Sequence, residues 1–158
     1  GEGTPSQDAD EPVSEREPWE HVTDDDLREG ALKLTGGIEQ IPPMYSAIKV
    51  DGKRLYKSAR EGKEVERKPR SVTIHEFEVR RDSKDPQSVH FSTHVSKGTY
   101  VRTLAYDLCK SLGTTGHLTA LRRTRIGSEF HIDDAWSIEQ LAEACGEDPA
   151  TFQKRRRD

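Results

Sequence analysis

The chain has 158 residues, of which 31% are hydrophobic and 34% are charged. This length suits one domain of ordinary size, and the lack of any run of about 20 apolar residues excludes a transmembrane helix. Cys109 and Cys145 are the two cysteines, and they form no CxxC motif. Their spacing therefore argues against a disulfide scaffold or a zinc ribbon.

The net charge of -4 is the sum of blocks with opposite signs. Residues 1–29 hold eleven acids and two bases, residues 49–70 hold nine bases and four acids, and residues 96–126 hold six bases and one acid. Basic surface of this density neutralises phosphates and releases counterions, which supplies most of the affinity for nucleic acids. A solvated charged face is the alternative, and charge counting alone does not decide between the two.

The first helix is predicted over residues 24–34. Before it, three prolines among acidic and small residues predict an extended or loop segment over residues 1–18. Thr23 is a good N-cap, and three aspartates fill the first turn, where the helix dipole favours negative charge. The apolar face and the glycines expected to end the helix are Leu27, Ala31, Leu34, Gly36 and Gly37.

Short elements are expected next. Residues 38–50 hold a Pro-Pro break followed by a strand-like apolar stretch, and Asp51-Gly52 predicts a turn. After the turn, apolar residues spaced from Leu55 onward predict a short helix that ends near Gly62.

Two strands follow, over residues 71–80 and 89–95, and the polar link between them favours an antiparallel pair. Apolar and polar residues alternate in both, but the apolar phase of the first strand flips between Ile74 and Phe77. A bulge or twist is therefore expected there, because only an irregularity keeps both side chains on the core side.

The clearest helix spans residues 100–112, with Gly113 as its terminator and apolar residues at helical spacing. A final helix is expected over residues 138–145, capped by Ser137, with Ile138, Leu141, Ala142 and Cys145 pointing inward. The basic tail, residues 146–158, is expected to be disordered. Together these elements predict an α+β fold with a mixed, mainly antiparallel sheet and flanking helices.

The residues offer little for metal or hydrolytic chemistry. His90 and His94 share the polar face of a predicted strand without a third ligand nearby, and no serine has the context of a nucleophile elbow. The segment SKGTYVRTLAYDL is more informative, because it places Lys97, Tyr100 and Arg102 around the N-terminal end of the strongest helix, which attracts anions. Tyrosines lie among the basic residues, as stacking on unpaired nucleotides requires, although tyrosines half-buried at domain edges give the same pattern.

Three blocks of the sequence are distinctive: IPPMYSAIKVDGKRLYKSAREGKEVERKPR (41–70), SKGTYVRTLAYDLCKSLG (96–113) and GHLTALRRTRIG (116–127). In their order and spacing they resemble the TruB-type tRNA pseudouridine synthases. The opening GEGTPSQDAD is similar to the family's Gly-x-x-Thr-x-Thr-x-Asp-Ala-x stretch, with Ser6 where threonine is usual. The resemblance spans roughly residues 1–130, and the first block favours the stand-alone bacterial and organellar type.

The resemblance implies isomerisation of a T-loop uridine of tRNA to pseudouridine, with no cofactor and no metal. The family's nucleophile is an aspartate in a Gly-x-Leu-Asp-Pro-like motif that precedes the Gly-x-x-Thr stretch, and these 158 residues do not contain that motif. The target base is flipped out of the loop to reach the aspartate. The chain thus resembles the C-terminal part of the catalytic domain without its nucleophile, so we expect it to be inactive alone.

Family roles carry over to matching positions. Arg102 resembles the arginine that pairs with the catalytic aspartate, Tyr100 a residue that lines the uracil pocket, and Leu121 the apolar residue of the opposite pocket wall. Asp8 matches an acid near the active site. Residues 42–70 align with a thumb-like RNA-binding region, and the candidate RNA-binding residues are Lys49, Lys53, Arg54, Arg60, Lys97, Arg122 and Arg123.

The resulting hypothesis is a partial catalytic domain over residues 1–145, followed by the tail. The expected partner is the T arm of tRNA, without a membrane or a metal, and the protein is expected to be a monomer. It carries no signal-peptide pattern, so we expect a cytoplasmic or organellar (plastid or mitochondrial) protein that is not secreted. The alternatives are a catalytically inactive RNA-binding or RNA-chaperone module and a protein-interaction domain with a charged surface.

Overall fold

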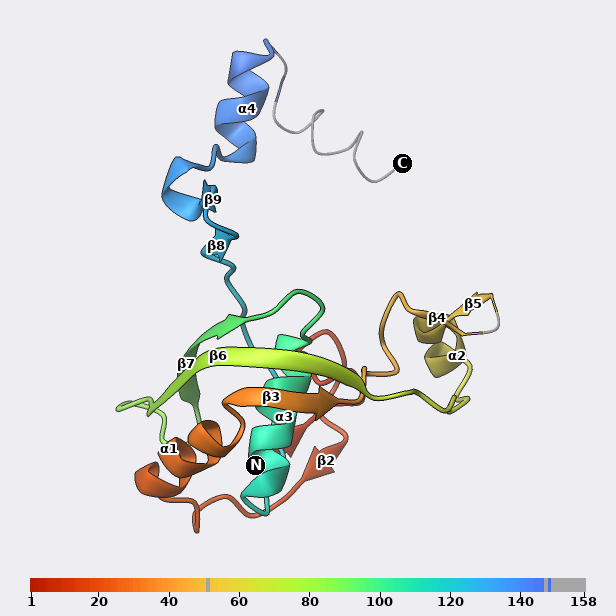
Figure 1. The fold of residues 1–158 in the computed structure, drawn as a ribbon, viewed down its shortest axis with the longest axis vertical. Helices are drawn as coiled ribbons and strands as arrows, with labels where there is room; N and C mark the ends of the chain where they lie inside the picture. The colour runs from red at the N-terminus through yellow and green to blue at the C-terminus, as the bar shows by residue number, and fades with distance from the viewer. Residues whose placement is uncertain (51, 147, 149–158) are drawn as a thin grey trace. The chain divides into compact units, whose positions relative to one another are not determined.

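In the computed structural model, which describes residues 1–50, 52–146 and 148, a three-stranded antiparallel sheet organises the unit Gly1–Ala120 (Figure 1). Its strand order is β3-β6-β7, with β3 at Gly36–Gln40, β6 at Arg70–Arg81 and β7 at Val89–Val95. Together with the helices, this sheet confirms the predicted α+β class.

The central strand β6 contains the predicted irregularity. Its register against β7 shifts between Ile74 and Glu76, so one extra residue on β6 restores the inward phase. Ile74 and Phe77 are consequently both buried, although they are three residues apart. The bulge thus allows a twelve-residue strand to present Val72, Ile74 and Phe77 to one core.

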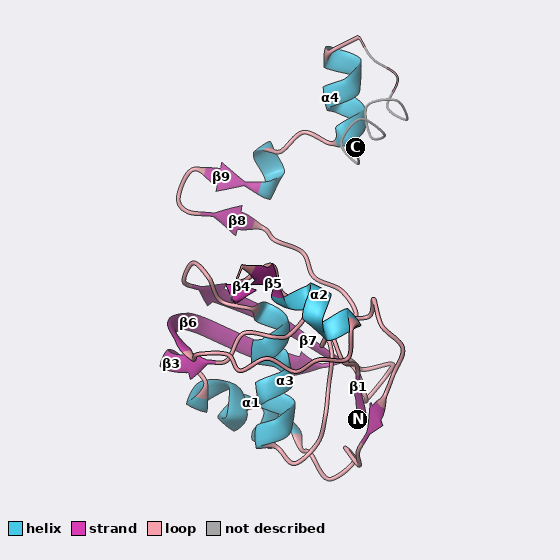
Figure 2. Ribbon diagram, turned by 90° about the vertical axis from the view of Figure 1, so that its right-hand side faces the viewer, coloured by secondary structure: helices cyan, strands magenta, loops and turns pink. Residues whose placement is uncertain are grey.

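Helices α1 (Asp24–Lys33) and α3 (Val101–Ser111) lie side by side against the sheet (Figure 2). Ala31 of α1 and Leu104 and Leu108 of α3 are buried in the same cluster as the β6 residues. The start of α1 is the predicted one. Thr23 and Asp26 form a capping box, in which each side chain bonds the other's backbone N–H. The hydroxyl and the backbone N–H of Thr23 both donate to the Asp26 carboxylate, and these two bonds lower the pKa of Asp26.

The N-terminal segment is mostly loop, as predicted, but it is fixed firmly to α3. Strand β1 (Glu2–Gly3) pairs with β2 (Glu15–Arg16). The Lys110 ammonium of α3 donates to Glu15 and to Glu17, and its bond to Glu15 lowers the pKa of that carboxyl. Thr115 also donates to Glu15, over 2.8 Å, so the N-terminal segment is bonded to the C-terminal end of α3 and to the residues that follow it.

The strand-like stretch expected after the Pro42-Pro43 break is wrong for most of its length. Strand β3 ends at Gln40, before the break, and the next strand, β4, contains only Lys49–Val50. The carbonyls of Ser46 and Ile48 accept from the N–H groups of Tyr56 and Leu55 instead of from a neighbouring strand. β4 pairs with β5 (Lys53–Arg54), and helix α2 (Leu55–Arg60) follows as predicted. Gly52 has a φ of 78°, which suits the expected turn, whereas Asp51 lies outside the described residues.

The unit Leu121–Asp158 contains a hairpin of β8 (Arg125–Ile126) and β9 (Phe130–His131), a 3-10 turn (Ile132–Asp134) and helix α4 (Ile138–Ala144). Ser137 and Gln140 form the expected capping box. The predicted inward face is wrong, because only Ala142 is buried, while the other three residues, Ile138, Leu141 and Cys145, are exposed. A short unit with so few apolar residues covers little of this helix. Most of the predicted tail, residues 147 and 149–158, lies outside the described residues.

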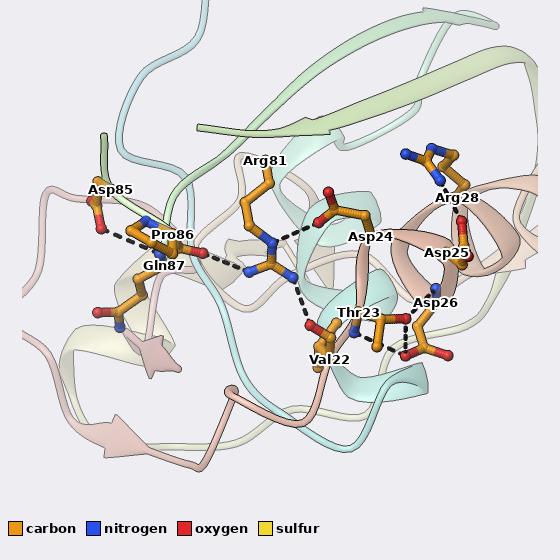
Figure 3. Close-up of polar contacts among 10 residues, drawn as sticks. All are labelled: Val22, Thr23, Asp24, Asp25, Asp26, Arg28, Arg81, Asp85, Pro86 and Gln87. Atoms are coloured by element: carbon orange, nitrogen blue, oxygen red, sulfur yellow. Dashed lines mark hydrogen bonds and ion pairs between the residues drawn. The ribbon is translucent and has the colours of Figure 1, made fainter. Parts of the chain in front are cut away.

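Arg81, at the end of β6, connects the sheet to the start of α1 (Figure 3). Its guanidinium donates to Asp24 over 2.8 Å, to the carbonyl of Val22 over 2.6 Å, and to the carbonyl of Pro86. Only 18% of the Arg81 side chain is exposed, whereas 57% of the Asp24 side chain is, so the bond to the Val22 carbonyl is the one best shielded from water. One arginine thereby bonds three acceptors from two separate segments, the start of α1 and the loop that contains Pro86.

We predict that Arg81→Met destabilises the protein by about 2 kcal/mol, because methionine fills the space but leaves these acceptors without a donor. Chemical denaturation of the wild type and the variant measures this difference. Arg80→Met is the matched control, since Arg80 is the exposed neighbour on the same strand. Equal losses in the two variants contradict the structural role of Arg81.

Candidate functional site

Tyr100 and Arg102 meet at the N-terminal end of α3. Tyr100 is the N-cap residue, and the guanidinium carbon of Arg102 lies 5.9 Å from the centroid of its ring. Arg102 also donates a hydrogen bond to the backbone carbonyl of Tyr45. Both side chains are half-buried. An arginine held in this way keeps its charge and retains further N–H donors for an anion.

A buried glutamine fixes the backbone at this point. Gln40, the last residue of β3, is only 2% exposed. Its side-chain oxygen accepts from the N–H of Tyr100 over 2.8 Å, and its side-chain nitrogen donates to the carbonyl of Tyr100 over 3.2 Å. The same carbonyl accepts the first bond within the helix, from Leu104. The sheet therefore sets where α3 begins.

The loop that contains Asp8 contacts the first turn of α3. Thr103 is buried and donates over 2.8 Å to the side-chain oxygen of Gln7. Gln7 has a φ of 62°, a strained value for a residue other than glycine, and such strain is often found at functional sites. Asp8 forms a parallel bridge with Leu118, and its backbone bonds the hydroxyl of Thr4. The structure thus brings the loop of Asp8 to the helix of Arg102.

The start of α3 is electropositive. Among the described residues no side chain caps α3, in contrast to α1 and α4. Its first N–H groups therefore add the positive end of the helix dipole to the charge of Arg102. A carboxylate or a phosphate is the chemical group that suits this position.

The thumb-like segment, residues 42–70, presents its predicted RNA-binding residues to solvent. Lys49, Lys53, Arg54 and Arg60 are all exposed. The Arg60 guanidinium lies 5.7 Å from the centroid of the Tyr56 ring, and a hydrogen bond from Arg54 lowers the pKa of the Tyr56 hydroxyl. This cluster combines one ring with two cations, a combination that can stack on a base and bind its phosphate. Lys53 differs, because its ammonium already bonds the Glu61 carboxylate at 2.7 Å.

A hollow of about 430 Å³ lies beside β4 in the same segment. Its walls are partly apolar and partly cationic, and Arg67 has a buried Nε atom without a hydrogen-bond partner among the described residues. The lining residues are Pro42, Ile48, Lys49, Val50, Leu55, Glu66, Arg67, Lys68, Pro69 and Arg70. The hollow extends the basic surface without joining the Arg102 cluster through any lining residue.

The other predicted site residues belong to the turn before α3 and to the second unit. Lys97 is exposed in the turn before α3, where Gly98 has a φ of 92°. Leu121, Arg122 and Arg123 begin the second unit, and all three are exposed, Leu121 by 59%. The cluster of Tyr100 and Arg102 is formed within the first unit alone.

The histidines do not form a metal site. His90 bonds Asp82 at 2.6 Å and lowers the pKa of that carboxyl to about 2, while His94 lies against His75 with ring centroids 4.7 Å apart. In the described part of the chain, no three histidine, cysteine or acidic side chains are grouped to hold a metal ion. No helix in that part is long and apolar enough to cross a bilayer.

Two family models match the chain in succession. The TruB family pseudouridylate synthase (N terminal domain) matches residues 1–101. The tRNA pseudouridylate synthase B C-terminal domain matches residues 102–154, so α3 contributes to both regions. The chain belongs to the TruB family of pseudouridylate synthases.

Relatives named tRNA pseudouridine synthase B align over most of the chain. The Aromatoleum aromaticum protein is 56% identical over 121 residues, which cover 77% of this chain and 38% of that protein. The Thermobifida fusca protein is 45% identical over 148 residues, covering 90% and 50%. The Flavobacterium johnsoniae protein is 41% identical over 144 residues, covering 91% and 62%. The chain thus spans about half the length of the TruB relatives it matches.

Three contributors to the TruB site were not predicted from the sequence: Gln7, Gln40 and the Tyr45 carbonyl. Gln40 precedes the Pro-Pro break at the end of a strand, where an ordinary polar residue at the surface is the usual expectation. Gln7 and Gln40 bond residues 96 and 60 positions away. No local periodicity signals such contacts.

Asp107 on α3 yields a pH prediction. Burial raises the pKa of this carboxyl from 3.8 to about 6, so the folded state favours its protonated form. The group therefore costs stability increasingly as pH rises from about 4 to 6, and the cost stays constant above that range. We predict that Asp107→Asn raises the melting temperature above pH 6 and leaves it unchanged below pH 4.

Thermal melts across this pH range test the prediction. Asp10→Asn serves as the control, because Asp10 is exposed in the N-terminal loop. A gain in melting temperature that is the same at every pH contradicts the assigned cause.

Proposed function

We propose that this chain is part of an enzyme that converts a uridine in the T loop of tRNA to pseudouridine, with the catalytic aspartate contributed by residues outside these 158. The observation that carries the proposal is the pair of Tyr100 and Arg102 at the start of α3, in a chain that the two family models match from residue 1 to 154. The names of the relatives supply the reaction and the substrate class.

Arg102 has the chemistry that the proposed partner requires. A guanidinium stays charged at any physiological pH and grips a carboxylate with two parallel N–H bonds. Its contact with the Tyr45 carbonyl is to a neutral acceptor, so the positive charge remains available for the aspartate. The reaction replaces the N1–C1′ bond of uridine with a C5–C1′ bond and moves the C5 proton to N1, so no external reactant is consumed. In this proposal Tyr100 lines the uracil pocket, Leu121 forms its opposite wall and Asp8 lies near the active site.

The RNA-binding surface in this proposal includes the thumb-like segment, Lys97, Arg122 and Arg123. Exposed cations spread over this surface suit the phosphates of the T arm, and the ring of Tyr56 suits an unpaired base. The enzyme is proposed to act as a monomer in the cytoplasm or in an organelle.

The purified 158-residue chain is predicted to form no pseudouridine in a T-loop RNA, whereas the longer protein that includes the aspartate motif forms it. Release of the C5 label from tritiated uridine measures turnover in both. Turnover by the chain alone overturns the assignment of the nucleophile. Binding without turnover by both proteins supports the alternative of an RNA-binding or RNA-chaperone module.

In the longer protein, we predict that Arg102→Ala lowers kcat by about 10²- to 10³-fold, the loss typical of removing a transition-state electrostatic partner. The affinity for tRNA is expected to change little, because the proposed partner is the nucleophile and not the RNA. Single-turnover kinetics and filter binding separate these effects, with the exposed Arg80→Ala as control. A parallel fall in affinity identifies Arg102 as a phosphate contact instead.

The double variant Arg54→Gln/Arg60→Gln is predicted to weaken tRNA binding and to reduce the slope of log K against log salt by about 1 to 2. Both arginines are exposed around Tyr56, and each proposed phosphate contact releases counterions. Arg28→Gln/Arg80→Gln removes the same charge from other exposed positions. The same change in slope for both pairs shows a general charge effect and no thumb-like RNA contact.

A further inference from the structure

Gln40 is a polar side chain at a buried position, where an apolar residue is usual. A primary amide carries two N–H donors and an oxygen acceptor, and burying them costs free energy unless they are bonded. Gln40 is 2% exposed, and one of its N–H donors and its oxygen acceptor both form hydrogen bonds with the backbone of a single residue, Tyr100. An apolar side chain of the same size fills this space without that cost, so the two bonds are the distinctive contribution of glutamine.

These two bonds lie at the start of α3, next to the side chains of the proposed active site. The carbonyl of Tyr100 accepts two hydrogen bonds, one from the side-chain N–H of Gln40 and one from the backbone N–H of Leu104, which is the first bond within the helix. Fixing this carbonyl fixes the first turn of α3 and therefore the direction in which the side chains of Tyr100 and Arg102 leave the backbone.

The residues that follow Gln40 act on the same group from another side. Pro42-Pro43 ends the strand, and the chain then turns so that the Tyr45 carbonyl accepts from Arg102. Segment 40–45 thus holds the backbone of Tyr100 at one end and the guanidinium of Arg102 at the other. Two independent contacts from one short segment define the orientation of Arg102.

We propose that Gln40 is a positioning residue for Tyr100 and Arg102, which aligns the guanidinium with the catalytic carboxylate through the backbone of Tyr100. This inference rests on the proposed function, since the carboxylate belongs to that function. Gln40 does not touch the substrate. A misplacement of about 1 Å at a reacting centre lowers the rate by about 10²-fold, so a clamp of this kind affects kcat and not RNA affinity.

The test uses the longer protein with the aspartate motif. Gln40→Met keeps the size of the side chain and removes both bonds, and it is expected to lower kcat by about 10- to 100-fold with KM for tRNA unchanged. Gln40→Leu also removes both bonds without burying a charge, and it provides a second variant if methionine prevents folding. Gln87→Met, at an exposed glutamine, is the matched control and is expected to keep wild-type kinetics.

A double-mutant cycle distinguishes positioning from general stability. In an Arg102→Lys background, Gln40→Met is expected to lower kcat by less than about 3-fold, because the group it positions is already altered. Equal fold-losses in both backgrounds overturn the proposal. So does a loss that follows the melting temperature in every variant.

Hydrogen exchange provides a measurement that is independent of turnover. Without the Gln40 acceptor, the Tyr100 amide is expected to exchange at least about 10-fold faster, while amides of the β6–β7 pair keep their protection. An unchanged rate at Tyr100 overturns the proposal even if the wild-type protein forms no pseudouridine. Failure of the proposed function is seen as a lack of turnover by the wild-type protein, whereas failure of the positioning role is seen as unchanged amide exchange at Tyr100. The two failures are therefore distinguished.

Discussion

The burial of Leu104 and Leu108 against β6 fixes helix α3, and the rest of the first unit is arranged around that helix. Its first turn is bonded to the sheet by Gln40 and to the N-terminal loop by Gln7, and Lys110 in its last turn is paired with Glu15 and Glu17. Each contact is weak compared with the apolar core, since a net hydrogen bond contributes about 1 kcal/mol. Together these contacts hold Arg102 at a defined position. A helix end without such contacts is free to fray in solvent.

The bulge of β6 serves the same helix. Without it, Phe77 would point away from Val72 and Ile74, and the surface that receives Leu104 and Leu108 would lose an aromatic side chain. Phe77 also packs edge-on against Phe91 of β7, with ring centroids 5.8 Å apart. An irregularity in a central strand therefore supports the position of α3, and through it the position of Arg102.

Much of this fold was predictable because its signals are local. The phase flip between Ile74 and Phe77 predicted the bulge, and the Thr23 and Ser137 patterns predicted two helix starts, since both depend on residues within four positions. The strand expected after Pro42-Pro43 was overestimated because its apolar residues gave no sign that the carbonyls of Ser46 and Ile48 bond Tyr56 and Leu55 instead of another strand. The predicted inward face of α4 was wrong because helical spacing shows which apolar residues share one face, but not whether another part of the protein covers that face. In the candidate site, the family resemblance predicted roles for Arg102 and Tyr100, but the contacts of Gln7 and Gln40 depend on tertiary structure. Charge counting likewise did not reveal that Lys53 is already paired with Glu61.

In the thumb-like segment, Arg102 donates to a main-chain atom, the carbonyl of Tyr45, so the contact depends on the path of the backbone and not on the side chain at position 45. Any residue at position 45 presents the same carbonyl, so substitution of Tyr45 leaves that contact chemically intact. The demand falls instead on the path of the backbone, which Pro42 and Pro43 restrict by locking their φ angles near -65°. A substitution at Pro42 or Pro43 is therefore expected to disturb the Tyr45 carbonyl more than a substitution of Tyr45 itself.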